Sequence, residues 1–258
     1  MLSIKELAKE LTLIMVITKA QIKSRYRKTF AGFLWVIMNP ILTFAVQALI
    51  FRYVLKLQVD RYYIFLLAGV IPWIFITSSI SMTVSTFVTQ RSTFTAFQIK
   101  PWILVLSTVL DNFINYVMSY LILALFIEPS AFFGLIPIFM FIVTSFILLL
   151  FTFFVSFGLA ILHVLFRDTQ FIVQFLINLA YFITPIFYPL SFIAPDYQFI
   201  IKMNVFYYFI RPFQNLFWEY DLSLFGISFL QAVLVLTVFM FLTFILWRKN
   251  RNALYLKL

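Results

Sequence analysis

Four basic residues within six positions are the strongest candidates for chemistry in the sequence: Lys23, Arg25, Arg27 and Lys28, just before an apolar run that begins at Phe33. An arginine guanidinium can hold a phosphate through paired, charge-assisted hydrogen bonds, whereas a lysine acts as a point charge. The cluster is therefore a candidate site for an anionic lipid head group or another phosphate. Lys and Arg also gather at the cytoplasmic ends of membrane spans without any ligand, so both interpretations stay open.

A second candidate is a polar patch inside an apolar stretch, made of Asp111, Asn112, Asn115 and Tyr116. Ionisable side chains inside a membrane are costly, and they tend to face a bundle interior or an aqueous path. We interpret the patch mainly as a contact between helices, with a place along a conduit as the alternative. The single His163 is interpreted as a helix-end histidine rather than a proton relay.

The composition excludes several kinds of catalytic site. The chain has no Cys and one His, and none of its five Gly opens a G-x-x-x-x-G-K-[ST] phosphate loop. Sulfur ligation, a site with two imidazoles and a nucleotide loop of this kind are thus ruled out. We expect no enzyme activity, no metal and no cofactor in this chain.

The overall composition indicates an all-α polytopic membrane protein. Of 258 residues, 64% are hydrophobic and 11% are charged, whereas soluble domains are about 45–50% apolar and about 25% charged. Six stretches are long enough to cross a bilayer, at about 33–51, 62–88, 101–127, 131–166, 171–188 and 224–247.

The distribution of charge predicts the topology. With these six spans, 14 of the 19 basic residues fall on the side that holds both termini, and five fall on the other side. That bias predicts cytoplasmic N- and C-termini in a cytoplasmic (inner) membrane. It also accounts for the net charge of +10 without a nucleic-acid partner.

Three segments flank the spans. Residues 3–22 have apolar residues at spacings of three and four, so residues 1–30 are predicted to form an amphipathic helix on the cytoplasmic surface, ahead of a single transmembrane domain over 31–258. The loop 89–100 is short, polar and basic, and it is predicted to lie inside. Residues 190–220 combine Pro breaks with aromatics, which suits two short re-entrant helices on the outside.

Four motifs together resemble one family: KSRYRKTFAGFLWVIMNP, YIFLLAGVIPW, FRDTQFIVQF and TPIFYP. The chain is similar to the membrane subunit of type-2 (ABC-2) exporters of lipid-linked polysaccharide, most of all to O-antigen permeases. The resemblance implies a homodimer of permeases, two separate ATPase subunits that bind ATP and Mg²⁺, and an undecaprenyl-type lipid-linked polysaccharide as substrate. Two departures from the family pattern, Asn204-Val205 and Lys100-Pro101-Trp102, bear on the identity of the polymer.

The resemblance also implies roles for particular residues. The loop 89–100 corresponds to a coupling helix, so the expected ATPase contacts are Arg91, Phe94, Phe97 and Lys100, together with Arg167 and Asp168. The expected substrate head-group site is Lys23, Arg25, Arg27 and Lys28, with Tyr26 and Trp35 beside the first sugars. The expected conduit or gate residues are Pro40, Asp111, Asn115, Pro185, Tyr188 and Arg211.

Other functions remain as alternatives. A teichoic acid or capsular polysaccharide exporter would share these motifs, and a drug or lipid exporter of the ABC-2 type would share the fold. A membrane enzyme acting on lipid-linked sugars would need a cluster of acids, His or metal ligands, which the sequence lacks. A secondary transporter would show more intramembrane charges and repeated halves.

Overall fold

The structure, a computed structural model, is helical throughout the residues that it describes, which are 4–26, 38, 42, 45–46, 49–50, 59–91, 99–124, 134–219 and 221–257, apart from short turns. The longer helices are α1 (Ile4–Tyr26), α3 (Tyr62–Thr83), α6 (Pro101–Ala124), α8 (Leu135–Leu165), α9 (Thr169–Ile183) and α12 (Leu222–Lys257). The short elements are α4 (Thr86–Thr89), η2 (Leu190–Phe192), η3 (Pro195–Tyr197), α10 (Gln198–Met203), α11 (Tyr207–Gln214) and η4 (Asn215–Glu219).

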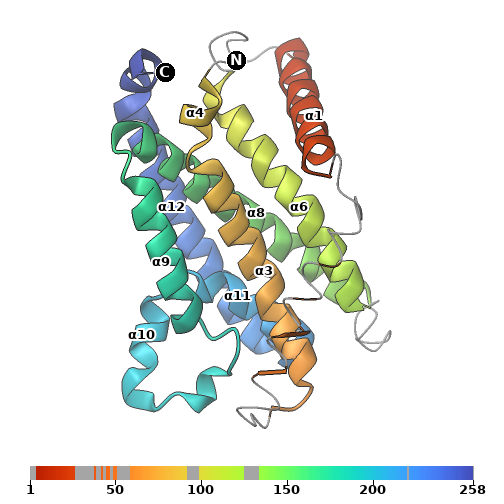
Figure 1. Cartoon of the computed structure of the whole chain (residues 1–258). Coiled ribbons are helices and arrows are strands. Elements are labelled where there is room, and N and C mark those ends of the chain that lie inside the picture. The colour runs from red at the N-terminus through yellow and green to blue at the C-terminus, as the bar shows by residue number, and fades with distance from the viewer. Residues whose placement is uncertain are drawn as a thin grey trace.

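The bundle has two distinct ends (Figure 1). One, here called the terminal end, holds α1, α4 and the last turns of α12, so both chain termini lie there. The other, the distal end, holds η2, η3 and α10. Two termini at one end agree with an even number of crossings, as the charge distribution predicts.

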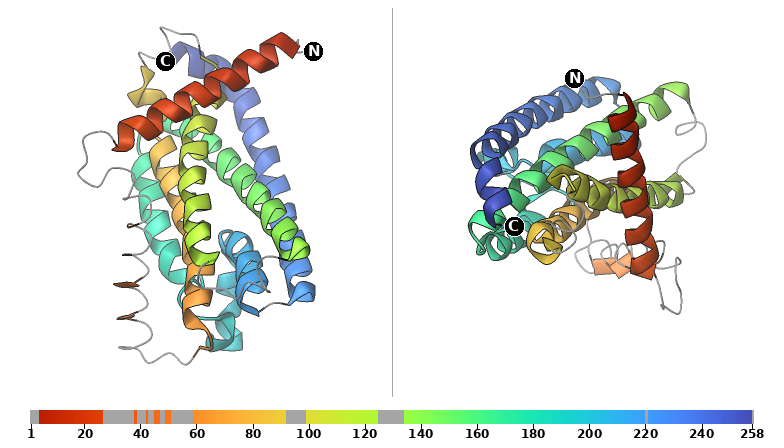
Figure 2. Two further views of the ribbon diagram at one scale, coloured as in Figure 1. Left: turned by 90° about the vertical axis from the view of Figure 1, so that its right-hand side faces the viewer. Right: turned by 90° about the horizontal axis from the view of Figure 1, so that it is seen from above.

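The first helix lies across the terminal end rather than along the bundle, and it packs on α6 (Figure 2). Small polar side chains allow the close approach: the Thr18 hydroxyl donates to the Ser107 carbonyl at 3.3 Å, and the Ser107 hydroxyl donates to the Ile14 carbonyl at 3.4 Å. Most of the apolar side chains at 11–16 face outward. This is the geometry expected of the predicted amphipathic helix; the membrane surface itself stays a prediction.

At the centre of the bundle is α3, and α12 lies at its edge. About 78% of the apolar window of α3 is buried, against 17% for α12. The core beside α3 is aromatic, with Tyr120 within 4.8–5.7 Å of the rings of Phe141, Phe213 and Phe217. Rings at these separations add to the area that they bury, so many of the aromatic residues serve packing between helices.

Two long helices, α8 and α12, pack along each other at Gly158. A Cβ added there would lie 3.2 Å from the Thr243 hydroxyl oxygen, and this hydroxyl donates to the Phe154 carbonyl at 3.0 Å.

At its start, α12 is capped by Asp221, whose carboxylate accepts hydrogen bonds from the Ser223 and Leu224 amides at 2.8 and 3.1 Å. With the Ser223 hydroxyl, these bonds hold the pKa of Asp221 below its usual value.

Four of the described helices are long and apolar enough to cross a membrane, namely α3, α6, α8 and α12. The predicted span 171–188 is shorter than expected, because α9 has 15 residues and ends at Ile183. Pro185 disfavours the helical conformation of the residue before it, and Thr184 is extended, with ψ 130°. Two other boundaries also differ: α3 ends at Thr83 and not at Val88, and α12 continues to Lys257 rather than ending at Trp247.

Two predictions about the membrane lie beyond these observations. The predicted first span, 33–51, falls outside the described residues except at six positions, so the count of six spans stays a prediction. Residues 190–219 fold as short helices, as expected, but into five elements rather than two. Their re-entry into the membrane stays a prediction.

Candidate functional site

The structure joins two groups that the sequence presented separately, because Arg25 of the basic cluster forms an ion pair with Asp111. The same guanidinium donates to the Asn112 side-chain oxygen at 3.1 Å and lies 3.2 Å from the Met82 sulfur. The Asp111 side chain is 1% exposed and that of Arg25 is 25% exposed. Asp111 thus connects α6 to α1, through its ion pair with Arg25.

Helical spacing explains why these residues meet. Thr18, Gln21 and Arg25 share one face of α1, three to four residues apart, and Ser107, Thr108 and Asp111 share one face of α6. The two faces pair residue by residue, since the Gln21 amide donates to the Thr108 hydroxyl at 3.1 Å between the contacts of Thr18 and Arg25. This polar seam, residues 18–25 of α1 on 107–112 of α6, holds α1 to the bundle.

The seam bears on the predicted head-group site. The Arg25 guanidinium is already bound by Asp111 and Asn112, so a phosphate would have to share it. Lys23 is exposed and makes no ion pair within the described part of the chain. Arg27, Lys28, Trp35 and the Tyr26 side chain lie outside the described residues, so their role stays a prediction.

Most predicted ATPase contacts that the structure describes lie at the terminal end. Arg91 follows α4, and Arg167 and Asp168 form the exposed turn between α8 and α9, on the same end of the bundle (Figure 1). Lys100 precedes α6 and forms an ion pair with Glu10 of α1. Phe94 and Phe97 lie outside the described residues. Arg91, Arg167 and Asp168 thus lie at one end of the bundle, and coupling to an ATPase stays a prediction.

The Lys100–Glu10 pair yields a test of how Lys100 acts. We expect Lys100→Glu to lower transport-linked ATPase activity severalfold, because it places a like charge beside Glu10 and loosens α1 from α6. The exchange variant Glu10→Lys/Lys100→Glu restores the pair and should regain the activity. Activity as low in the exchange variant as in the single variant would instead indicate that Lys100 touches the ATPase directly.

The predicted conduit and gate residues separate into two groups. Asp111 and Asn115 lie on α6, with Asp111 in the polar seam. Pro185, Tyr188 and Arg211 belong to the segments that fold at the distal end, while Pro40 is outside the described residues. The role of these residues in a conduit or gate stays a prediction.

Three side-chain hydrogen bonds hold the TPIFYP motif, 184–189, in place. The Gln214 amide donates to the Pro185 carbonyl at 3.0 Å, the Tyr62 hydroxyl to the Phe187 carbonyl at 3.1 Å, and the Asn204 amide to the Thr184 hydroxyl at 2.7 Å. These bonds connect α3, α10 and α11 to the end of α9. Arg211 pairs with Glu219 at 2.9 Å. Asn204, which the sequence marked as a departure, is thus part of this contact.

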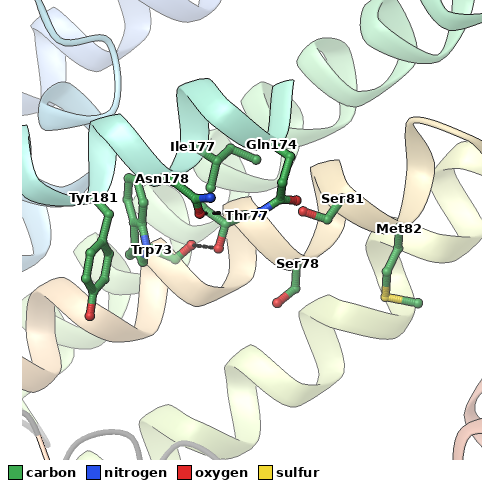
Figure 3. A pocket seen from close by; sticks show the side chains of 9 residues that line it. All are labelled: Trp73, Thr77, Ser78, Ser81, Met82, Gln174, Ile177, Asn178 and Tyr181. Atoms are coloured by element: carbon green, nitrogen blue, oxygen red, sulfur yellow. Dashed lines mark hydrogen bonds between the residues drawn. The ribbon is translucent and has the colours of Figure 1, made fainter. Parts of the chain in front are cut away.

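A groove between α3 and α9 was missed by the sequence analysis (Figure 3). Its volume is about 520 Å³, and its lining residues are Trp73, Thr77, Ser78, Ser81 and Met82 of α3 with Gln174, Ile177, Asn178 and Tyr181 of α9. The sequence did contain a signal for this groove. The four lining residues of α9 follow one another at intervals of three, one and three residues, so they share one face of the helix. The signal was overlooked because each helix reads as an apolar span with scattered polar residues.

The comparisons with known proteins agree on one family. The model of the ABC-2 type transporter family matches residues 12–218. The chain is 31% identical over 224 residues to an O-antigen export system permease protein of Myxococcus xanthus, covering 85% of each chain. Two O-antigen export system permease proteins of Klebsiella pneumoniae are each 27% identical, over 231 and 239 residues, covering 88% of this chain and 88–90% of theirs. The chain therefore belongs to the ABC-2 type transporter family, as a transport permease rather than an enzyme.

Proposed function

We propose that the chain is the membrane subunit of an exporter that moves a lipid-linked polysaccharide, O antigen in particular, out of the cytoplasm across the inner membrane. The observation that carries this proposal is the 31% identity to an O-antigen export permease over 85% of both chains. Two copies would pair with two ATPase subunits, which bind ATP and Mg²⁺ and supply the energy.

The described geometry supports a division of labour between the two ends. The lipid tail of the substrate can remain in the bilayer, so a protein route is needed only for the charged head and the glycan. The terminal end offers Lys23 and Arg25 of the basic cluster for the head and the exposed Arg91, Arg167 and Asp168 for an ATPase. At the distal end, the bonded TPIFYP segment is the natural candidate for the outer closure.

Deleting the gene from its own host tests the proposal. We expect the cells to lose the surface polysaccharide and to accumulate the lipid-linked polymer in the inner membrane, because synthesis continues without export. Immunoblotting of surface glycan and mass spectrometry of the lipid fraction measure both effects. Re-expression of the permease with its ATPase should restore the surface polymer, and a deletion strain with normal surface glycan would contradict the proposal.

The same fractions distinguish the alternatives. A polymer rich in phosphate or in uronic acid would identify a teichoic acid or capsular exporter. Loss of resistance to a drug with unchanged glycan would identify a drug exporter. No feature of the described residues favours these over O-antigen export.

A further inference from the structure

The groove between α3 and α9 carries polar groups on a surface where lipid would be expected. Gln174 and Asn178 are exposed, as is Gln170 one turn earlier, so three amides follow one line along an otherwise apolar helix. An amide facing hydrocarbon would lose its hydrogen bonds at a cost of a few kcal/mol. This line therefore faces water, protein or a polar substrate.

The hydrogen-bonding capacity of the groove is only partly used. The Gln174 amide reaches the Asn178 oxygen at 3.4 Å, and the Thr77 hydroxyl donates to the Trp73 carbonyl at 2.9 Å. The Asn178 amino group and the hydroxyls of Ser78 and Ser81 make no hydrogen bond to the described residues. Donors and acceptors are thus interspersed along the groove, as the hydroxyls of a sugar require.

Rigid apolar side chains complete the groove. Trp73 is 4% exposed and is fixed by the rings of Tyr181 at 5.8 Å and Phe206 at 5.3 Å. Ile177, at 7% exposed, lines the groove from α9. Because these side chains are already packed, a sugar that touches their exposed edges does not have to order them first.

The lining is also free of charge, since none of its nine side chains is acidic or basic. Among the described residues, a charged group contacts the lining at Met82. The Arg25 guanidinium lies 3.2 Å from the Met82 sulfur, and its charge is neutralised by the ion pair with Asp111. A carboxylate or phosphate on a passing sugar would lose hydration here without gaining a cation. An uncharged sugar exchanges its bonds to water for bonds to the groove.

We propose that the α3–α9 groove is a weak binding site for uncharged sugar units of the exported polymer, and that it disfavours acidic sugars. This rests on the proposed function, and it adds the class of glycan. Conduction requires sites that bind weakly enough to release, which matches a few neutral contacts in an open groove. On this basis neutral O antigens are substrates, whereas polyanionic capsules and teichoic acids are not.

The experiment uses the absence of native Cys. Ser81→Cys places one thiol in the groove of the full-length permease, reconstituted with its ATPase in nanodiscs, and the rate of maleimide labelling reports whether the groove is occupied. The probes are maltohexaose, a neutral hexasaccharide, and hexagalacturonate, an acidic one. At a concentration about nine times its Kd, maltohexaose should slow labelling about tenfold, whereas hexagalacturonate at the same concentration should leave the rate unchanged.

Two further variants serve as controls. Ser223→Cys places the thiol at the exposed start of α12, and neither sugar should protect it. Adding Gln174→Arg to Ser81→Cys supplies a cation, so hexagalacturonate should now slow labelling. Equal protection by both sugars, or none by maltohexaose, overturns the proposed site. Surface glycan in the deletion strain tests the export function separately from the labelling experiment. A negative labelling result therefore overturns the groove site without overturning export, and a deletion strain with normal glycan overturns export without depending on the groove.

Discussion

Replacing Arg25 by methionine is expected to lower the free energy of unfolding by about 3 kcal/mol, the low end of the range for breaking a buried ion pair. The variant leaves the Asp111 carboxylate in a site where its side chain is 1% exposed, with the Asn112 and Met82 contacts of the guanidinium also lost. The low end applies because Arg25 itself is 25% exposed and water can partly replace it. Thermal unfolding in detergent, followed by tryptophan fluorescence, measures the change.

The double variant Arg25→Met/Asp111→Leu separates the causes of that loss. It removes both charges, so most of the stability should return. Lys23→Met, at an exposed position on the same helix, should change stability by less than about 0.5 kcal/mol. If the double variant were as unstable as the sum of its single variants, the ion pair would not be what holds α1 on α6.

The second large effect is expected at Gly69, where α3 meets the TPIFYP segment. A Cβ at this position would lie 3.0 Å from the Gln214 amide nitrogen and 3.4 Å from a methyl carbon of Ile186. Gly69→Val should therefore displace Gln214 from the Pro185 carbonyl and cost about 1–3 kcal/mol through overpacking. We expect a lower melting temperature and reduced export, since the distal end loses a bond that fixes the end of α9.

Gly226→Val is the matched control. It makes the same change inside another helix, α12, where an added Cβ meets nothing within 4 Å. Because Val has a higher helix propensity than Gly, this variant should be as stable as the parent or slightly more so. The difference between the two variants then reports the contact at Gly69 alone, and equal stabilities would contradict it.

Much of the architecture could be predicted because the membrane limits the options. Long apolar stretches must be helical where no water can bond to the backbone, and the helices predicted from about 62, 101, 131 and 224 are confirmed, with observed starts at 62, 101, 135 and 222. The ends of α3 and α9 were placed too late along the sequence. Those ends depend on single residues such as Pro185, which a hydropathy window averages away.

The contacts between helices were harder to predict. Arg25 and Asp111 were each singled out, but as members of different sites, because nothing in a single sequence shows that residues 86 positions apart meet. The α3–α9 groove was missed for the same reason, since five of its lining residues come from α3 and four from α9. The spacing of residues shows which of them share one face of a helix. Which other helix that face contacts is decided by the packing of the bundle.

The polar seam also has a consequence for the order of events during synthesis. Its contacts join residues 86 to 89 positions apart, and at about 5–20 residues per second the ribosome needs about 4–18 s to make that length of chain. The segment that becomes α1 therefore leaves the ribosome well before Asp111 does. When the acidic residue arrives at the bilayer, the arginine that neutralises it has already been made.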